Sequence, residues 1–259
     1  LTMTDVTFDG QIGNKVRIDD SLSRRDLPDI VVTLDHCTLT NQITYSGSGF
    51  AKTGTNAVGF DYLENGGITF TMKNCTATST KKTSIISVSD LQKGKVSITD
   101  SKIQGNLSIY GSDVTVTGTT AEGILGNYIT GKNAVQVKDN TFTSLDFTTY
   151  VDTTLENIKA AKASNTNKGA LTLSGTGTVT IKDGVYDGGT STGLSVEGTP
   201  AMIESGYFKG EAGAVTGPYE TPEGMIIKEV TDGEYAGYST VAEGKEEEDP
   251  SAVYVAQIY

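Results

Sequence analysis

The stretch "VTLDHCTL", residues 32–39, is one copy of an eight-residue frame that recurs along the chain. The first, third and eighth places of the frame are apolar in every copy, and the sixth place holds a small or modest residue. The other copies are "LTMTDVTF" (1–8), "FTMKNCTA" (70–77), "VSITDSKI" (96–103), "VTVTGTTA" (114–121), "VQVKDNTF" (135–142), "VTIKDGVY" (179–186) and "AMIESGYF" (201–208). Internal similarity of this kind is typical of repeat architectures.

The fifth place of the frame predicts a sharp corner. Its residue types tolerate bridge or left-handed backbone angles, for which Asn, Asp and His are enriched among non-glycine residues. The residues at this place are Asp5, His36, Asn74, Asp100, Gly118, Asp139, Asp183 and Ser205. Each frame therefore predicts a short strand, a corner and a second strand. Because side chains alternate along a strand, places one and three point inward before the corner, and places six and eight after it.

The spacing of the frames predicts a parallel β-helix. The shorter separations between frame starts, 18 to 26 residues, suit one coil of a three-sided solenoid. A third apolar segment follows several frames: "QITY" (42–45), "SIISV" (84–88), "NLSIY" (106–110), "GIL" (123–125) and "SLDF" (144–147). We therefore expect an all-β chain in which residues 1–212 form a parallel β-helix with one continuous core.

Two longer gaps between frames predict insertions. Residues 46–67 are rich in Gly and polar residues and predict a loop excursion. The segment 153–164, "TTLENIKAAKAS", predicts a short helix, because Thr153 and Glu156 have capping-box spacing and the Ala/Lys run favours helix. We expect the loops 46–67 and 146–168 to be presented by the rigid scaffold.

The last part of the chain, residues 213–259, predicts a strand-rich cap joined to an acidic linker. Residues 224–242 predict strands around a turn at Asp232-Gly233. The segment 243–252, "EGKEEEDPSA", predicts a solvated linker, and 253–259 alternates like a further strand. The cap would cover the open end of the solenoid, which is otherwise an aggregation edge.

Composition narrows the classes of partner. The 259 residues include 32 acidic and 20 basic side chains, a net charge of −12, which argues against nucleic-acid binding. The sequence contains no run of about 18 apolar residues, so we expect no membrane-spanning segment in it. The chain opens with Leu1 in strand-like sequence, so we expect a fragment of a longer precursor.

His36 and Cys37 suggest either a metal pair or a thiol with its base. The frame favours another interpretation, in which His36 lies at a corner and Cys37 and Cys75 stack inward as small buried residues. Two ligands without CxxC or HxxxH neighbours make a poor zinc site. A disulfide between Cys37 and Cys75 remains open if their coils are neighbours. We assign no metal, cofactor or catalytic residue.

The frame resembles the right-handed parallel β-helix repeats of pectate-lyase-like proteins, over residues 1 to about 210. The phrases "VTIKDGVYDGG" (179–189) and "IESGYFKG" (203–210) resemble repeats of large secreted, wall-attached, adhesin-like surface proteins of gut bacteria. This resemblance implies a non-enzymatic extracellular segment, either adhesive or a structural stalk, at the bacterial cell surface. The candidate partners are glycans and proteins of host or neighbouring cell surfaces.

Many members of that superfamily are polysaccharide lyases or hydrolases, so an enzyme acting on pectin-like polymers is the alternative. The resemblance then implies clustered aspartates and a Gly-His-Gly motif in hydrolases, and no Gly-His-Gly occurs here. The best acidic pair is Asp19-Asp20 beside Arg17. For Asp19-Asp20 and for the corners Asp139 and Asp183, we favour the interpretation that they are turn residues.

A binding surface has two candidate forms. Outward threonines on the first strand of each frame could form an ice-binding array, but Asp35, Lys73, Lys138 and Lys182 interrupt it, and strand propensity explains the threonines. Tyrosines near the C-terminal end could form a sugar-binding platform. Among Tyr186, Tyr207, Tyr219, Tyr235 and Tyr238, we discount Tyr186 as inward and Tyr207 as a frame residue on an outward place.

Overall fold

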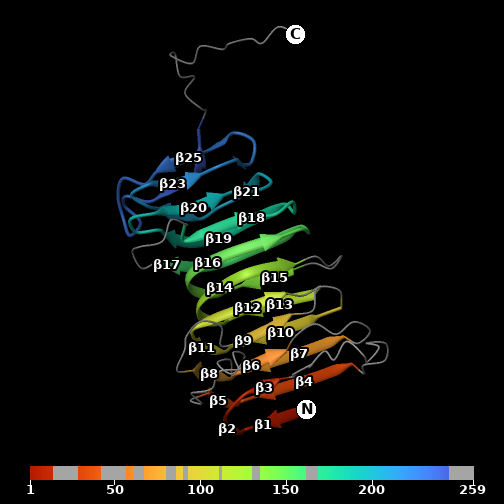
Figure 1. Ribbon diagram of the computed structural model, residues 1–259. Helices are drawn as coiled ribbons and strands as arrows, with labels where there is room; N and C mark the ends of the chain where they lie inside the picture. Colours follow the sequence, from red (N-terminus) through yellow and green to blue (C-terminus); the bar gives the residue numbers. More distant parts are fainter. Residues whose placement is uncertain are drawn as a thin grey trace, which may run out of the picture.

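The computed structural model describes residues 1–13, 29–41, 57–60, 67–79, 86–89, 93–110, 113–129, 135–161 and 169–244. These residues form 26 strands in one continuous sheet, and none of them lies in a helix. Figure 1 shows the coils stacked into an elongated rod, with the N-terminus at one end and the C-terminal strands at the other. The chain is thus a parallel β-helix, as the frame predicts.

The first face of the rod contains the strands that precede each corner. They are β1 (Thr2–Thr4), β4 (Ile30–Asp35), β7 (Ile68–Lys73), β10 (Lys95–Thr99), β13 (Asp113–Thr117), β15 (Val135–Lys138), the first parts of β17 (Thr153–Ala161) and β19 (Val179–Asp187), β21 (Ala201–Ile203) and β24 (Tyr219–Glu220). Equivalent places pair in register, for example Leu34 with Met72 and Ile98 with Val116. Because the register is kept, each place of the frame forms a column along the rod.

The second face follows the corners. It contains β2 (Thr7–Asp9), β5 (Thr38–Asn41), β8 (Thr76–Ser79), β11 (Lys102–Gln104), the first parts of β14 (Thr120–Ile129) and β16 (Thr141–Thr149), the later parts of β17 and β19, and β22 (Tyr207–Lys209). The third face contains β3 (Ile12–Gly13), β6 (Val58–Phe60), β9 (Ile86–Ser89), β12 (Asn106–Tyr110), the later parts of β14 and β16, β18 (Leu171–Ser174), β20 (Thr192–Val196) and β23 (Gly213–Thr216).

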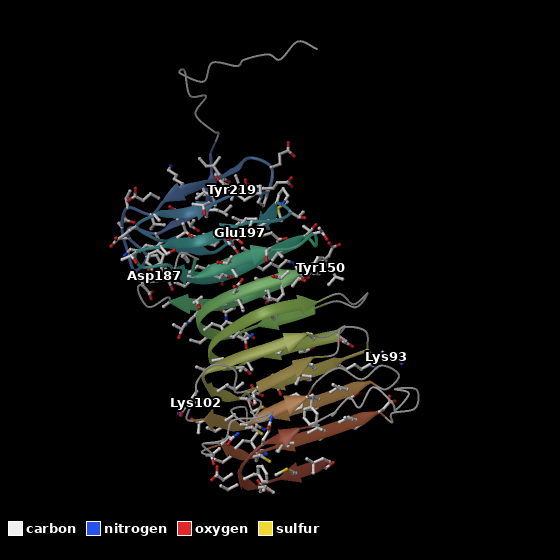
Figure 2. The ribbon with its side chains drawn as sticks, viewed as in Figure 1. Lys93, Lys102, Tyr150, Asp187, Glu197 and Tyr219 are labelled. Atoms are coloured by element: carbon white, nitrogen blue, oxygen red, sulfur yellow. The ribbon has the colours of Figure 1, made fainter. Side chains whose placement is uncertain are left out.

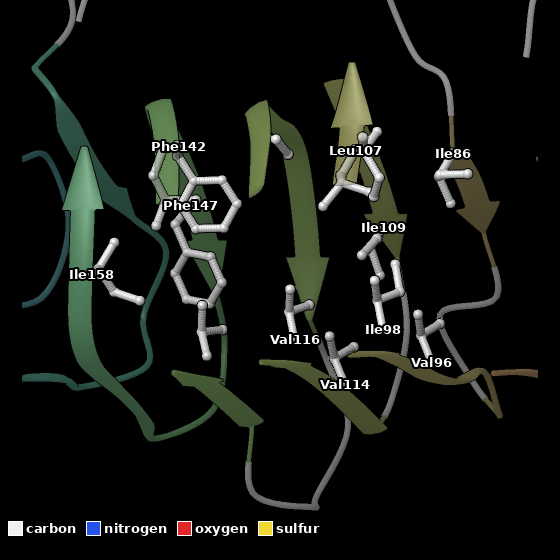
Figure 3. Close-up of a cluster of buried hydrophobic side chains, with 14 of the residues drawn as sticks. Ile86, Val96, Ile98, Leu107, Ile109, Val114, Val116, Phe142, Phe147 and Ile158 are labelled. Atoms are coloured by element: carbon white, nitrogen blue, oxygen red, sulfur yellow. The ribbon is translucent and has the colours of Figure 1, made fainter. Parts of the chain in front are cut away.

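The inward columns fuse into one apolar core along the rod. The third place is fully buried at Leu34, Ile98 and Leu155, and the eighth place is buried at Leu39 and Phe142. Figure 3 shows part of this core, where Ile98, Val116, the β16 residues Phe142 and Phe147, and Ile158 lie in a row along the inside of the rod. Burying a side chain of this size contributes about 1.5–3 kcal/mol, so burial is the main term that stabilises the stack.

The corners have the predicted backbone. Positive φ occurs at fifth-place residues, including His36 (φ 51°), Asp139 (φ 56°) and Gly118 (φ 60°). Ser205 is the exception: the left-handed angle falls on the next residue, Gly206 (φ 134°). A glycine one place later can turn the chain instead, because it adopts positive φ without steric cost.

The helix predicted for residues 153–164 is wrong, since its described part is β17. This strand pairs in parallel with β15 on one side and β19 on the other. Residues 153–160 are a ninth copy of the frame, with Leu155, Ile158 and Ala160 buried and Asn157 at the corner (φ 49°). Pairing on both edges and core burial outweigh the helix propensity of the Ala/Lys run, which is worth only tenths of a kcal/mol per residue. The predicted loop 146–168 therefore contains strand residues at 146–149 and 153–161.

The loop excursion predicted at 46–67 also contains a strand. β6 pairs in parallel with β3 and β9, so it supplies the third side of its coil. Ala57 and Val58 are fully buried and Phe60 is almost so, which shows that this piece belongs to the core. The third-side segment predicted at 42–45, together with the rest of 46–67 apart from 57–60 and 67, lies outside the described residues.

Parallel pairing continues beyond residue 212, because β23 pairs with β20 and β24 pairs with β21. The chain then forms an antiparallel hairpin from β25 (Met225–Glu229) and β26 (Ser239–Glu243), and β26 pairs antiparallel with β22. The predicted strands around Asp232-Gly233 are therefore confirmed, with Gly233 at φ 80° in the connection. The predicted final strand at 253–259 and most of the acidic linker lie outside the described residues.

Candidate functional site

His36 and Cys37 do not form a joint site. His36 occupies the corner, its side chain is 57% exposed, and its Nδ1 lies 2.8 Å from Oδ1 of Asp35. Cys37 points into the core and is 1% exposed. Because the corner sends these neighbouring side chains in opposite directions, the imidazole is not placed to act as the base of this thiol.

The two cysteines stack on neighbouring coils as the frame predicts. Both are free thiols, and Sγ of Cys75 accepts the backbone N–H of Cys37 at 3.2 Å. Each thiol also donates to a carbonyl two residues earlier, Cys37 to Asp35 at 3.3 Å and Cys75 to Lys73 at 3.0 Å. Burial raises the pKa of the Cys75 thiol above its ordinary value, which disfavours the reactive thiolate. These contacts serve the corner backbone.

The predicted acidic residues are not brought together by the described structure. Asp139 and Asp183 are corner residues on coils separated by the coil of β17. Oδ1 of Asp139 accepts the Asn157 amide at 2.8 Å, and Oδ1 of Asp183 accepts the backbone N–H of Gly184 at 2.8 Å. Asp19 and Asp20 lie outside the described residues. Within the described ranges, no group of three or more His, Cys, Asp or Glu residues could hold a metal ion.

The outward side of the first face is polar and mixed. Threonines at the second place form a column, as in the pairing of Thr33 with Thr71. The fourth place holds threonines in some coils and charged residues in others, and Lys138 and Glu156 form an ion pair there at 2.7 Å. That contact with Glu156 raises the pKa of the Lys138 ammonium. The face thus carries fixed charges between its hydroxyl groups.

Tyrosines do gather at the C-terminal end of the rod. Tyr207, on β22, stacks on Tyr235 with ring centroids 3.9 Å apart. Tyr235 meets Tyr238 edge to face at 5.8 Å, and Lys209 Nζ lies 5.2 Å from the Tyr238 ring centroid. Tyr186 is buried, as predicted for its inward place. Tyr207, discounted earlier, is therefore a member of the cluster.

Beside these rings lies a cavity of about 480 Å³ that opens to solvent, which we name the terminal pocket. Its lining comes from the ends of β19 and β22 and the residues that follow them, from β23 and β25, and from the start of β26 and the residue before Tyr238. The lining residues are Asp187, Gly189, Phe208, Lys209, Gly210, Glu211, Ala214, Glu229, Gly237 and Ser239. Figure 2 shows Asp187 at the left margin of the rod among the blue-green coils, and Tyr150 at the opposite margin.

Asp187 is the fixed carboxylate of the terminal pocket. Its Oδ1 accepts the backbone N–H of Gly189 at 2.9 Å, and its Oδ2 accepts the hydroxyl of Tyr238 at 3.2 Å. Partial burial raises the pKa of the Tyr238 phenol, and the negative charge of Asp187 raises it further. The phenol therefore keeps its proton at neutral and mildly alkaline pH and donates a hydrogen bond to Asp187.

The pocket residues Asp187, Lys209, Glu211 and Glu229 were missed by sequence reasoning. Asp187 and Lys209 each follow the eighth place of a frame by one residue, and they are paired across neighbouring strands. The equivalent positions of Asp187 and Lys209 were visible in the repeat. The position of Glu229 in the pocket lining was not visible there, because it depends on the hairpin folding back onto β22.

Comparisons with protein-family models, with curated proteins and with solved structures find no match to this chain. Among the residues that the structure describes, no helix is long and apolar enough to cross a membrane.

Proposed function

We propose that this chain is a non-enzymatic extracellular β-helix segment of a bacterial surface protein, serving as an adhesive or structural stalk. The observation that carries the proposal is the stack of nine frames in register, with one apolar core from β1 to β22. At about 4.8 Å per coil, this stack is roughly 40 Å long. Such a rod holds whatever its end presents at a fixed distance and orientation.

The resemblance to repeats of pectate-lyase-like and adhesin-like proteins supports the cell-surface assignment. The net charge of −12 supports a soluble polar exterior and favours partners other than nucleic acid. Glycans and proteins of host or neighbouring cell surfaces are the proposed partners. The tyrosine cluster supports glycan binding, because aromatic rings combine an apolar face with polar edges.

The described acids support binding or structure more than hydrolysis. An inverting glycosidase needs two carboxyl groups about 6.5–9.5 Å apart on either side of one bond. Asp139 and Asp183, the corner acids considered for this role, accept bonds from Asn157 and Gly184 and so stabilise corners. The enzyme alternative depends on Asp19 and Asp20.

The test is a glycan and host-matrix binding array, run beside a polysaccharide degradation screen on the same protein. We expect retention on one or more array ligands and no release of reducing or unsaturated sugars from pectin-like polymers. Release that disappears in the Asp19→Asn/Asp20→Asn double variant would overturn the proposal and establish the enzyme. Absence of both binding and release would leave the stalk without its adhesive role.

A further inference from the structure

We propose that the terminal pocket is a binding subsite for a neutral pyranose ring of a glycan. This inference deepens the proposed adhesive function and rests on it. Its volume, about 480 Å³, lies within the range of roughly 300–1,000 Å³ that is typical of small-molecule sites. All the residues that line it belong to the last coils and the hairpin, so the site lies at the end of the rod.

The pocket combines an apolar patch with polar walls. Ala214 contributes apolar surface, and Phe208, which is fully buried, lies behind it in the wall of the pocket. Asp187, Lys209 and Ser239 contribute hydrogen-bonding groups of opposite types. A pyranose has apolar C–H faces and hydroxyl groups that both donate and accept, so it fits a site of this composition better than a purely apolar ligand does.

The charges of the lining select among sugars. Three carboxylates, those of Asp187, Glu211 and Glu229, face one ammonium, that of Lys209. This excess of negative charge disfavours uronates, sialylated sugars and sulfated sugars. Lys209 is the one ammonium of the lining, and its Nζ stands 5.2 Å from the Tyr238 ring centroid, where it can donate to a sugar hydroxyl. A neutral sugar does not meet the repulsion that an anionic sugar meets.

The pocket is also preorganised. Asp187 is fixed by Gly189 and Tyr238, and it retains lone pairs for ligand hydroxyls, since each carboxylate oxygen can accept two bonds. The Tyr207–Tyr235 stack holds the hairpin loop that carries Tyr238 against β22. A side chain already held in place loses little freedom when a ligand binds, which favours affinity.

The test is calorimetric titration of the whole chain with methyl glycosides of glucose, galactose, mannose and N-acetylglucosamine, and with glucuronate and galacturonate. Amide NMR shifts at Gly189, Gly210 and Gly237 locate any binding. We expect at least one neutral glycoside to bind and shift these amides, and the uronates to bind at least about tenfold more weakly. Asp187→Asn should weaken binding about tenfold, because it removes a charged acceptor.

Two further variants keep the outcome clear. Glu229→Gln changes an exposed pocket carboxylate and should weaken binding severalfold without loss of folding. Glu197→Gln makes the same change at an exposed site outside the lining and should leave affinity unaltered. If no neutral glycoside shifts the three glycine amides, or if uronates bind more tightly, the pocket assignment is wrong. Array binding that survives Asp187→Asn and Glu229→Gln would overturn the pocket and leave the adhesive function standing.

Discussion

The earlier coils and the last coils of the rod satisfy the backbone N–H groups at their corners in different ways. In the earlier coils, the sixth-place side chains of Cys75, Ser101 and Asn140 each accept a corner N–H from the preceding coil, and we call this set, with Cys37 and Thr119, the ladder. Cys75 Sγ accepts the Cys37 N–H at 3.2 Å, Ser101 Oγ accepts the Cys75 N–H at 3.2 Å, and Asn140 Oδ1 accepts the Thr119 N–H at 2.8 Å. Each of these buried corner donors is thus satisfied by the next coil.

The last coils replace this ladder with glycine and aromatic packing. Gly184 and Gly206 occupy the sixth place, and the eighth-place rings of Tyr186 and Phe208 lie close to them. These two rings stack in parallel with centroids 5.1 Å apart. The Gly184 N–H is satisfied by its own corner residue, Asp183.

In two neighbouring coils at the end of the rod, a larger side chain at one of the sixth and eighth places accompanies a smaller one at the other. In one coil, Ile158 holds the sixth place and the small Ala160 holds the eighth. In the next coil, Gly184 holds the sixth place and the large Tyr186 holds the eighth. A core packed to crystal-like density requires such compensation, because extra methylene groups force strain. The frame therefore accepts either polar bonding or aromatic filling at a corner.

The largest effect is expected for Gly184→Ala. A Cβ there would lie 2.5 Å from the Ile158 carbonyl oxygen and 2.9 Å from the Tyr186 ring, at a φ of 136°. Strain and overpacking together should lower the free energy of unfolding by roughly 3 kcal/mol or more, measured by urea denaturation. The control is Gly233→Ala, where φ is 80° and nothing lies within 4 Å, so that only about 1–2 kcal/mol is lost. Equal losses in the two variants would show that crowding between Gly184 and the Tyr186 ring does not limit the stability of the last coils.

A slightly smaller loss is expected when the ladder is broken at Asn140. Its Oδ1 accepts the Thr119 N–H, and its Nδ2 donates to the Val116 carbonyl at 2.7 Å, both in the core. Asn140→Leu would leave the Thr119 N–H without this partner and remove one bond to the Val116 carbonyl, at about 1–3 kcal/mol in total, measured by the shift of the urea midpoint. Asn157→Gly is the control, because its exposed amide bonds only the Asp139 carboxylate at 2.8 Å and glycine accepts its φ of 49°. If Asn140→Leu were neutral, the ladder would be incidental to the corners.

In the aromatic coils, removing a polar atom should instead stabilise the fold. The Tyr186 hydroxyl is buried without a hydrogen-bond partner within the described structure. Tyr186→Phe should therefore raise the free energy of unfolding at neutral pH by about 1 kcal/mol. Burial, and then the charge of Asp183, raise the pKa of this phenol.

The same raised pKa gives a pH dependence with a defined sign. The unfolded chain loses its tyrosine protons above a pKa of about 10, whereas folded Tyr186 keeps its proton there. Its contribution to stability is full below that pH and is lost progressively as pH rises above it. Urea midpoints from pH 8 to pH 11 should fall less steeply for Tyr186→Phe than for the wild type. Parallel curves would mean that the phenol titrates normally in the folded chain.

The fold was predictable because its signal is local and repeated. One eight-residue frame is enough to predict a corner such as Asp100 and an inward pair such as Val96 and Ile98. The ninth copy was missed because Thr153 stands where an apolar residue was required. In the structure Thr153 is buried and its hydroxyl donates to the Val151 carbonyl at 3.1 Å, so a satisfied polar group replaces the expected apolar one.

The terminal pocket was not predictable in the same way. Tyr235 and Tyr238 could be named from the sequence, but the Tyr238–Asp187 contact joins residues 51 apart. That contact depends on an antiparallel return of β26 onto β22, which no frame encodes. Periodicity therefore predicts the shaft of the rod, while its end is set by long-range packing.

The smallest effects are expected from the residues that first suggested a site. Cys37→Ser should lower the free energy of unfolding by less than about 1 kcal/mol, because Ser101 already makes the equivalent bonds on another coil, donating to Thr99 at 2.8 Å. His36→Asn should change it by less than about 0.5 kcal/mol, since Asn74 occupies the same corner of the next coil with the same φ of 51°. Neither change should affect array binding. A loss of binding in either variant would restore a role for the Cys37–His36 pair, whereas unchanged binding with these small shifts would show that one corner rule governs both residues.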